Sequence, residues 1–128
     1  HLLGRVAEPD VPKCYGAADC FVLPTKSLEC FGLIVLEAFA AGTPVIASRV
    51  AAIPEIAARQ GEEWLFEPGN DVELFQRMAR FLSRELNSTA DLRAIAEEFD
   101  RDKVSTLWSE FAFNNSEPSD AGLISNRP

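Results

Sequence analysis

The chain has 128 residues, of which 47% are hydrophobic and 25% are charged, a length and composition typical of one globular domain. No apolar run comes close to the roughly 18 residues that a membrane span requires, so we expect no membrane-spanning segment. The formal net charge of -8, without any cluster of Lys and Arg, argues against nucleic acid as a partner.

The cysteines and the single histidine restrict the chemistry that the chain can carry. Cys14, Cys20 and Cys30 show no CxxC spacing, which favours reduced structural thiols over a disulfide scaffold. With His1 as the only histidine, a zinc cluster or a Ser-His-Asp centre is close to excluded. We therefore expect no metal, no cofactor and a cytoplasmic location. The chain starts with apolar residues, HLLGRV, and we interpret this start as lying partway into a longer protein.

The first seventy residues predict alternating strands and helices. A strand is expected at residues 2–6, where Gly4 would allow a close approach of another group, and a helix from Asp10 to about Ala18. The next expected elements are a strand at 20–23, a helix at 31–41, a strand at 45–47, a short helix at 55–58 and a strand at 64–67. This alternation predicts an α/β fold, a Rossmann-like parallel sheet with flanking helices.

Helices are expected to dominate the remainder of the chain. Asn70 and Glu73 form a capping box for a helix that reaches about residue 85. Its apolar side chains, expected to pack together on the sheet, are Leu74, Phe75, Met78, Phe81 and Leu82. Further helices are expected at 91–98 and 102–113. Residues 114–128 are rich in Ser, Asn and Pro and are expected to be disordered, which gives a domain at 1–113 and a tail at 114–128.

Three loops are predicted to carry the ligand site. Ligands of open parallel sheets bind beyond the carboxyl ends of the strands, which selects residues 5–9, 25–30 and 49–53. The helix after the second loop has Glu37 as the only charged residue between Phe31 and Ile46. A carboxylate buried in such surroundings needs a partner. Alternatively, Glu37 pairs with Arg49 or is exposed to solvent at the helix edge.

These residues carry a resemblance to a known family. Glu29-Cys30-Phe31-Gly32 followed by Glu37 resembles the E-x7-E signature of the group 1 (family 4) glycosyltransferases, usually E-G-F-G-x-x-x-x-E. Cys30 stands where the family has glycine, and residues 51–52 are alanines where it frequently has two glycines. The similarity extends to residues 15–19 (YGAAD), 21–24 (FVLP), 37–48 (EAFAAGTPVIAS) and 53–56 (IPEI).

The resemblance implies a fold and a reaction. It places the chain in the C-terminal part of the donor-binding domain of a GT-B enzyme, a fold of two Rossmann-like domains that face a cleft. The implied activity is a hexosyl or other glycosyl transfer from a nucleotide-diphosphate sugar, with retention of configuration and without a metal. The acceptor, a sugar, lipid or other small molecule, would bind to an upstream domain. Peripheral membrane contact would also involve parts outside this chain.

The resemblance also implies roles for particular residues. The backbone N–H groups of Phe31, Gly32 and Leu33, beside Cys30, would hold the diphosphate at a helix N-terminus. Glu37 would accept hydrogen bonds from the ribose hydroxyls. Glu29 is the expected catalytic residue, facing the donor sugar and orienting it, while Arg5 and Val6 would lie near the base.

Two other classes of function stay open at this stage. The chain could be a non-catalytic nucleotide-binding or interaction module, because alanines replace the glycines at 51–52. A dinucleotide-dependent dehydrogenase is a weaker hypothesis, because no GxGxxG motif follows a predicted strand.

Overall fold

A parallel sheet lies at the centre of the computed structural model, which describes residues 1–27 and 31–100. Its strands are β1 (Phe21–Leu23), β2 (Val45–Ser48) and β3 (Leu65–Phe66), hydrogen-bonded in the order β1-β2-β3. Both pairs are parallel, with Phe21 opposite Val45 and Ala47 opposite Leu65. The predicted α/β class, a Rossmann-like parallel sheet with flanking helices, is confirmed.

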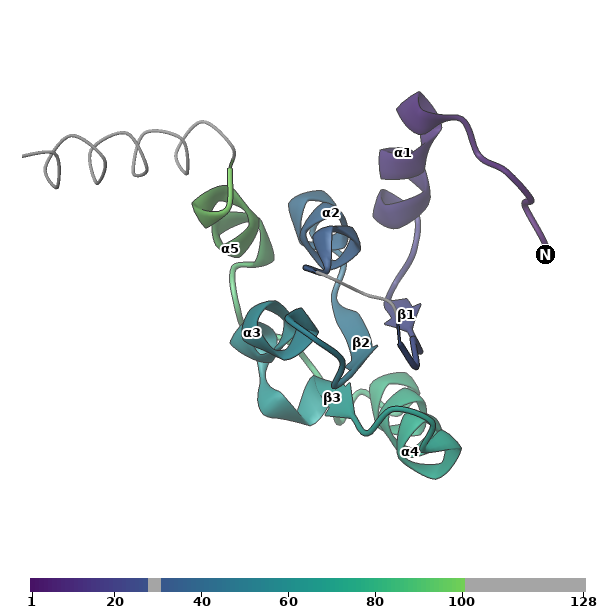
Figure 1. The fold of residues 1–128 in the computed structure, drawn as a ribbon, viewed down its shortest axis with the longest axis vertical. Coiled ribbons are helices and arrows are strands. Elements are labelled where there is room, and N and C mark those ends of the chain that lie inside the picture. Colours follow the sequence, from purple (N-terminus) through teal and green to yellow (C-terminus); the bar gives the residue numbers. More distant parts are fainter. Residues whose placement is uncertain (28–30, 101–128) are drawn as a thin grey trace, which may run out of the picture. The chain divides into compact units, whose positions relative to one another are not determined.

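Helices connect the strands and cover the sheet (Figure 1). Helix α2 and its neighbours α1 and α5 lie on one side of the sheet, and α4 lies on the other. None of the helices in the described part of the chain is long and apolar enough to cross a bilayer. In chain order they are η1 (Glu8–Asp10), α1 (Val11–Gly16), α2 (Leu33–Ala41), α3 (Ile53–Ala57), η2 (Ala58–Gln60), η3 (Glu62–Trp64), α4 (Asp71–Leu82) and α5 (Leu92–Glu98).

The core is built around the central strand. Every residue of β2 is buried, because helices cover both faces of this strand. On the α4 side, Ile46 packs with Trp64, Phe66 and Leu86. Gln60 is also buried and holds the start of β2, where its Oε1 accepts from the N–H of Val45 at 3.1 Å and its Nε2 donates to the carbonyl oxygen of the same residue.

Asn70 caps α4 as predicted, but the reciprocal half of the capping box is not found, because the Asn70 N–H donates to the carbonyl oxygen of Glu67. The predicted packing face is also only partly correct. The Glu73 N–H donates to Asn70 Oδ1 at 3.1 Å, and Leu74 and Phe81 pack against the core cluster. Phe75, Met78 and Leu82 are 71%, 40% and 78% exposed instead. At 100° per residue these three side chains lie about 50–110° around the helix from the half-buried pair, Leu74 and Phe81. A helix contacts a sheet along one line, so only one edge of the apolar arc is covered.

The predicted strand at residues 2–6 is wrong. These residues have no regular structure, and Leu2 and Leu3 are 103% and 70% exposed. No strand among the described residues pairs with them, and a strand requires a neighbour to take up its backbone hydrogen bonds. The expected close approach at Gly4 is also not found, because a Cβ added there would meet nothing within 4 Å.

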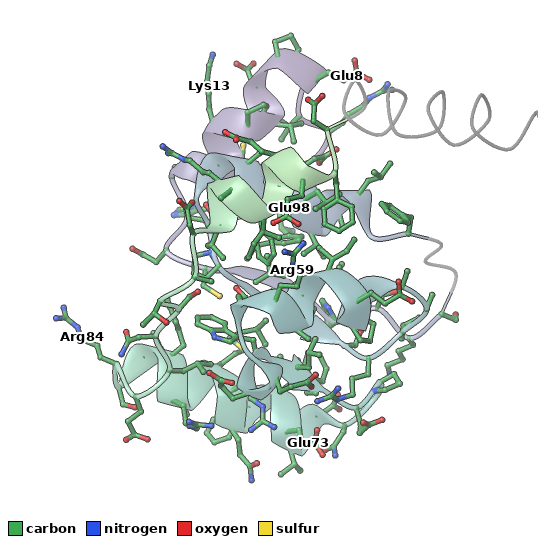
Figure 2. All side chains as sticks on the ribbon, turned by 90° about the vertical axis from the view of Figure 1, so that its left-hand side faces the viewer. Glu8, Lys13, Arg59, Glu73, Arg84 and Glu98 are labelled. Atoms are coloured by element: carbon green, nitrogen blue, oxygen red, sulfur yellow. The ribbon has the colours of Figure 1, made fainter. Side chains whose placement is uncertain are left out.

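The neighbouring helices differ from prediction mainly at their ends. Helix α1 ends at Gly16, two residues early, and Asp10 pairs with Lys13 at 2.7 Å rather than capping the helix. Helix α5 appears where expected. Its Glu98 accepts two parallel hydrogen bonds from Arg59, each 2.8 Å, and Figure 2 shows the two side chains facing each other. The helix predicted at 102–113 and the tail at 114–128 lie outside the described residues, so the domain boundary stays a prediction.

Candidate functional site

The carboxyl ends of β1 and β2 bring two of the predicted ligand loops together. Ser48, the last residue of β2, is fully buried, and its hydroxyl donates to the carbonyl oxygen of Thr25 at 2.6 Å. Helix α2 begins beside α3, since a Cβ on Gly32 would lie 3.4 Å from Cγ1 of Ile53. The loops after β1 and β2 and the start of α2 therefore share one edge of the sheet.

The start of α2 presents backbone N–H groups at this edge. Gly32 caps the helix in a left-handed conformation, with φ 81° and ψ 34°, so the helix begins at Leu33 rather than at Phe31 as predicted. Within residues 1–27 and 31–100, the N–H groups of Leu33 and Ile34 donate no hydrogen bond outside the helix, and none is possible inside it. Such groups, aligned with the helix dipole, favour an anion.

Glu37 is exposed, so the prediction that it is buried is wrong. Helix α2 buries its other faces, with Val35, Leu36, Ala38 and Phe39 in the core, while Glu37 lies on the face that the described residues leave open. Its Oε2 accepts a hydrogen bond from the Tyr15 hydroxyl at 3.1 Å. Of the two alternatives, exposure at the helix edge is found and pairing with Arg49 is not.

Arg49 instead belongs to a group of surface ion pairs. Its guanidinium lies 2.8 Å from Glu62 and 3.5 Å from Glu67. These carboxylates compete with any phosphate for the Arg49 charge. A second cation at this edge, Lys26, is exposed in the loop after β1.

A groove of about 680 Å³ lies between α1 and α2, with Glu37 on its wall. Its volume is within the range of small-molecule sites. Apolar side chains and two carboxylates line it, so it offers both a surface for a flat apolar group and hydrogen-bond acceptors. The lining residues are Glu8, Val11, Pro12, Tyr15, Gly16, Glu37, Ala40 and Ala41.

Tyr15 is a residue of this groove that the sequence did not single out. It is 9% exposed, and its ring meets the edge of Phe21 in a T-shaped contact with centroids 5.3 Å apart. Burial first, and then the Glu37 carboxylate, raise the pKa of Tyr15 to about 12, which keeps the phenol protonated and able to donate. Tyr15 and Glu37 are 22 residues apart, and no local periodicity connects them.

The other predicted site residues are not gathered at the groove. Arg5 is exposed and Val6 is half-buried in the irregular N-terminal segment, and neither lines the groove. Glu29 and Cys30 lie outside the described residues. The structure therefore brings Gly32, Leu33 and Glu37 together along α2, and it adds Tyr15 from α1.

Known proteins match the chain over much of its length. It is 35% identical over 103 residues to an exopolysaccharide phosphotransferase of Streptomyces coelicolor, covering 75% of this chain and 11% of that protein. It is 41% identical over 73 residues to a sulfoquinovosyl transferase of Arabidopsis thaliana, covering 55% and 14%. It is 37% identical over 98 residues to a D-inositol 3-phosphate glycosyltransferase of Rhodococcus opacus, covering 77% and 21%.

The matched region is a small part of each of these relatives. The chain spans between 11% and 21% of their lengths. The sequence profile of the family described as glycosyl transferases group 1 matches residues 1–99, which includes both the sheet and the groove. The chain therefore belongs to the group 1 glycosyl transferases.

Proposed function

We propose that the chain is the C-terminal part of the donor-binding domain of a GT-B glycosyltransferase and binds a nucleotide-diphosphate sugar along the open face of α2. The observation that carries the proposal is the placement of Leu33 and Glu37, four residues apart on exposed positions of one helix. The rise of an α-helix puts the carboxylate-bearing residue about 6 Å from the first helical N–H groups. In a nucleotide the ribose and the diphosphate are adjacent, so one ligand can reach both.

Each part of the donor has a complementary group in this arrangement. The N–H groups at the start of α2 hold the diphosphate, and Gly32 provides the left-handed cap from which this helix start begins. The Glu37 carboxylate accepts hydrogen bonds from the ribose hydroxyls. The apolar wall of the groove, formed by Val11, Pro12 and Ala40, takes one face of the base.

The chemistry follows from where charge develops during transfer. The bond between the anomeric carbon and the diphosphate breaks, and negative charge grows on the leaving phosphate. Fixed N–H dipoles at the helix start stabilise that charge without a metal. Glu29 orients the donor sugar, and the sugar keeps its anomeric configuration. The remainder of the protein, in the cytoplasm, supplies the acceptor site.

Nucleotide titration of the 128-residue chain tests this proposal. Calorimetry with UDP, GDP and ADP should detect binding of at least one of them. Replacing Glu37 with Ala should weaken that binding about 10- to 150-fold, because charge-assisted hydrogen bonds contribute roughly 1.5–3 kcal/mol. Glu85→Ala is the matched control, since Glu85 is an exposed carboxylate beyond the end of α4. Absence of binding by every nucleotide, or equal affinity in Glu37→Ala, would favour a non-catalytic interaction module.

A further inference from the structure

The Glu37 carboxylate is held at one oxygen and open at the other. Oε2 accepts from the Tyr15 hydroxyl at 3.1 Å. Within the described residues, Oε1 has no hydrogen-bond partner, although a carboxylate can accept several. The carboxylate lines the groove between α1 and α2. The free oxygen is therefore able to accept from a ligand while the other oxygen stays bound.

We propose that Tyr15 is a positioning residue, which holds the Glu37 carboxylate in the orientation that accepts a ribose hydroxyl and so makes the site select ribose over 2′-deoxyribose. This inference rests on the proposed function. It adds a residue outside the E-x7-E signature to the donor site, and it assigns the phenol hydroxyl a role that packing alone does not require.

Tyr15 is held firmly enough to position another side chain. Its ring is fixed against Phe21, and its carbonyl oxygen accepts from Oγ1 of Thr43 at 2.7 Å. Thr43 is itself buried just before β2, so this bond ties α1 to the sheet. The phenol hydroxyl therefore projects from a side chain whose backbone and ring are both restrained.

Glu37 needs such a restraint because it is exposed. A free glutamate on a helix surface samples many rotamers, and binding a ligand would have to overcome the loss of that freedom. The Tyr15 hydroxyl removes part of this cost before the ligand arrives, which is preorganisation. This gain in binding free energy applies only to a ligand hydroxyl that contacts the carboxylate, so it does not affect binding of the diphosphate.

Tyr15→Phe separates this role from packing, because it deletes only the hydroxyl. The 128-residue chain is titrated with UDP, GDP and ADP and with their 2′-deoxy forms. The ratio of ribo to deoxy affinity should fall about 2- to 10-fold in Tyr15→Phe, the range expected for one hydrogen bond. Phe81→Ala is the control. It removes packing against Trp64 on the α4 side of the sheet and does not line the groove, so it should lower the melting temperature while leaving the ratio unchanged.

The possible outcomes distinguish the two proposals. If the unmodified chain binds none of the nucleotides, the proposed function fails and this inference fails with it. If the chain binds and Glu37→Ala weakens binding, but Tyr15→Phe leaves the ratio intact, the donor site stands and the role of Tyr15 is refuted. An equal loss of ribo and deoxy affinity in Tyr15→Phe indicates packing alone, and also refutes it.

A second readout needs no ligand, because Tyr15 is the only tyrosine of the chain. Its ionisation can be followed by absorbance at 295 nm without interference from another phenol. With a pKa of about 12, roughly a tenth of the phenol is ionised at pH 11. Glu37→Gln should increase that fraction, because the carboxylate raises the pKa of Tyr15. An unchanged titration would show that the two side chains do not meet, and would overturn the proposal.

Discussion

Two glycines at opposite ends of α2 allow the diphosphate site to be tested independently of stability. Gly32 caps the start of the helix with φ 81°, and Gly42 caps its end with φ 84°. An added Cβ would lie 3.4 Å from Ile53 at the first position and 3.4 Å from Arg93 at the second. Replacing either with Ala therefore imposes the same backbone strain with a similar steric contact.

The expected loss of stability follows from the left-handed backbone. A non-glycine residue in this region costs about 1–2 kcal/mol, and the contacts at 3.4 Å add little because they are ordinary van der Waals distances. A domain of this size loses roughly 4–8 °C in melting temperature per kcal/mol. Gly32→Ala and Gly42→Ala should therefore both melt about 4–16 °C lower than the unmodified chain.

Only the first substitution should affect ligand binding. In Gly32→Ala the backbone strain and the contact of the methyl group with Ile53 act on the helix start that is proposed to hold the diphosphate, whereas Gly42 is at the far end. Differential scanning calorimetry gives the two melting temperatures, and titration with a nucleoside diphosphate below both gives the affinities. If both variants lose stability equally but Gly32→Ala binds the nucleotide as tightly as Gly42→Ala, the diphosphate does not sit at the start of α2.

Three further predictions concern packing, backbone strain and pH. Phe81→Ala should lower the free energy of unfolding by about 2–3 kcal/mol, because Phe81 packs on Trp64. Phe75→Ala, at a 71% exposed position, should change it by less than about 0.5 kcal/mol. Urea denaturation of the two variants compares these values. Ala51 has φ 48°, so Ala51→Gly should raise the free energy of unfolding by about 0.5–1 kcal/mol in the same assay, and a loss would contradict the strain argument. Burial raises the pKa of Cys20 from 9.0 to about 11. The folded state thus holds the thiol proton more tightly than the unfolded state does. The protonated Cys20 therefore contributes fully to the free energy of unfolding below pH 9, and this contribution is lost between pH 9 and pH 11. Cys20→Ala should lose less stability than the unmodified chain over that interval, as measured by thermal melts at stepped pH.

The alanine at position 51 also bears on the family resemblance. The family frequently has two glycines at residues 51–52, and the structure keeps a positive φ at Ala51. The conformation of this loop is set by its place between β2 and α3, since the Ile53 N–H bonds back to the carbonyl oxygen of Val50. The chain therefore retains a glycine-like turn without the glycine, and bears the strain that Ala51→Gly is expected to relieve.

Much of the fold could be predicted because its signals are local. The apolar residues of β2, the glycine that ends α2 and the Asn70 cap of α4 each depend on neighbouring residues, and the structure has all three. The strand predicted at residues 2–6 failed for the opposite reason, because an apolar segment becomes a strand only if another strand pairs with it. Phe75 and Leu82 show the same limit on a helix, where periodicity identifies an apolar arc but not how much of it is covered.

The candidate site divides in the same way. The sequence by itself determined the α/β class and the family, and it placed Glu37 in the helix that follows β1, six residues after a predicted start at Phe31. The structure begins that helix at Leu33, four residues before Glu37. Only the tertiary structure decided that Glu37 is exposed and that its partner is Tyr15, which lies 22 residues away. Those outcomes depend on how α1 and α2 pack side by side, and packing between distant segments is not encoded in any local pattern.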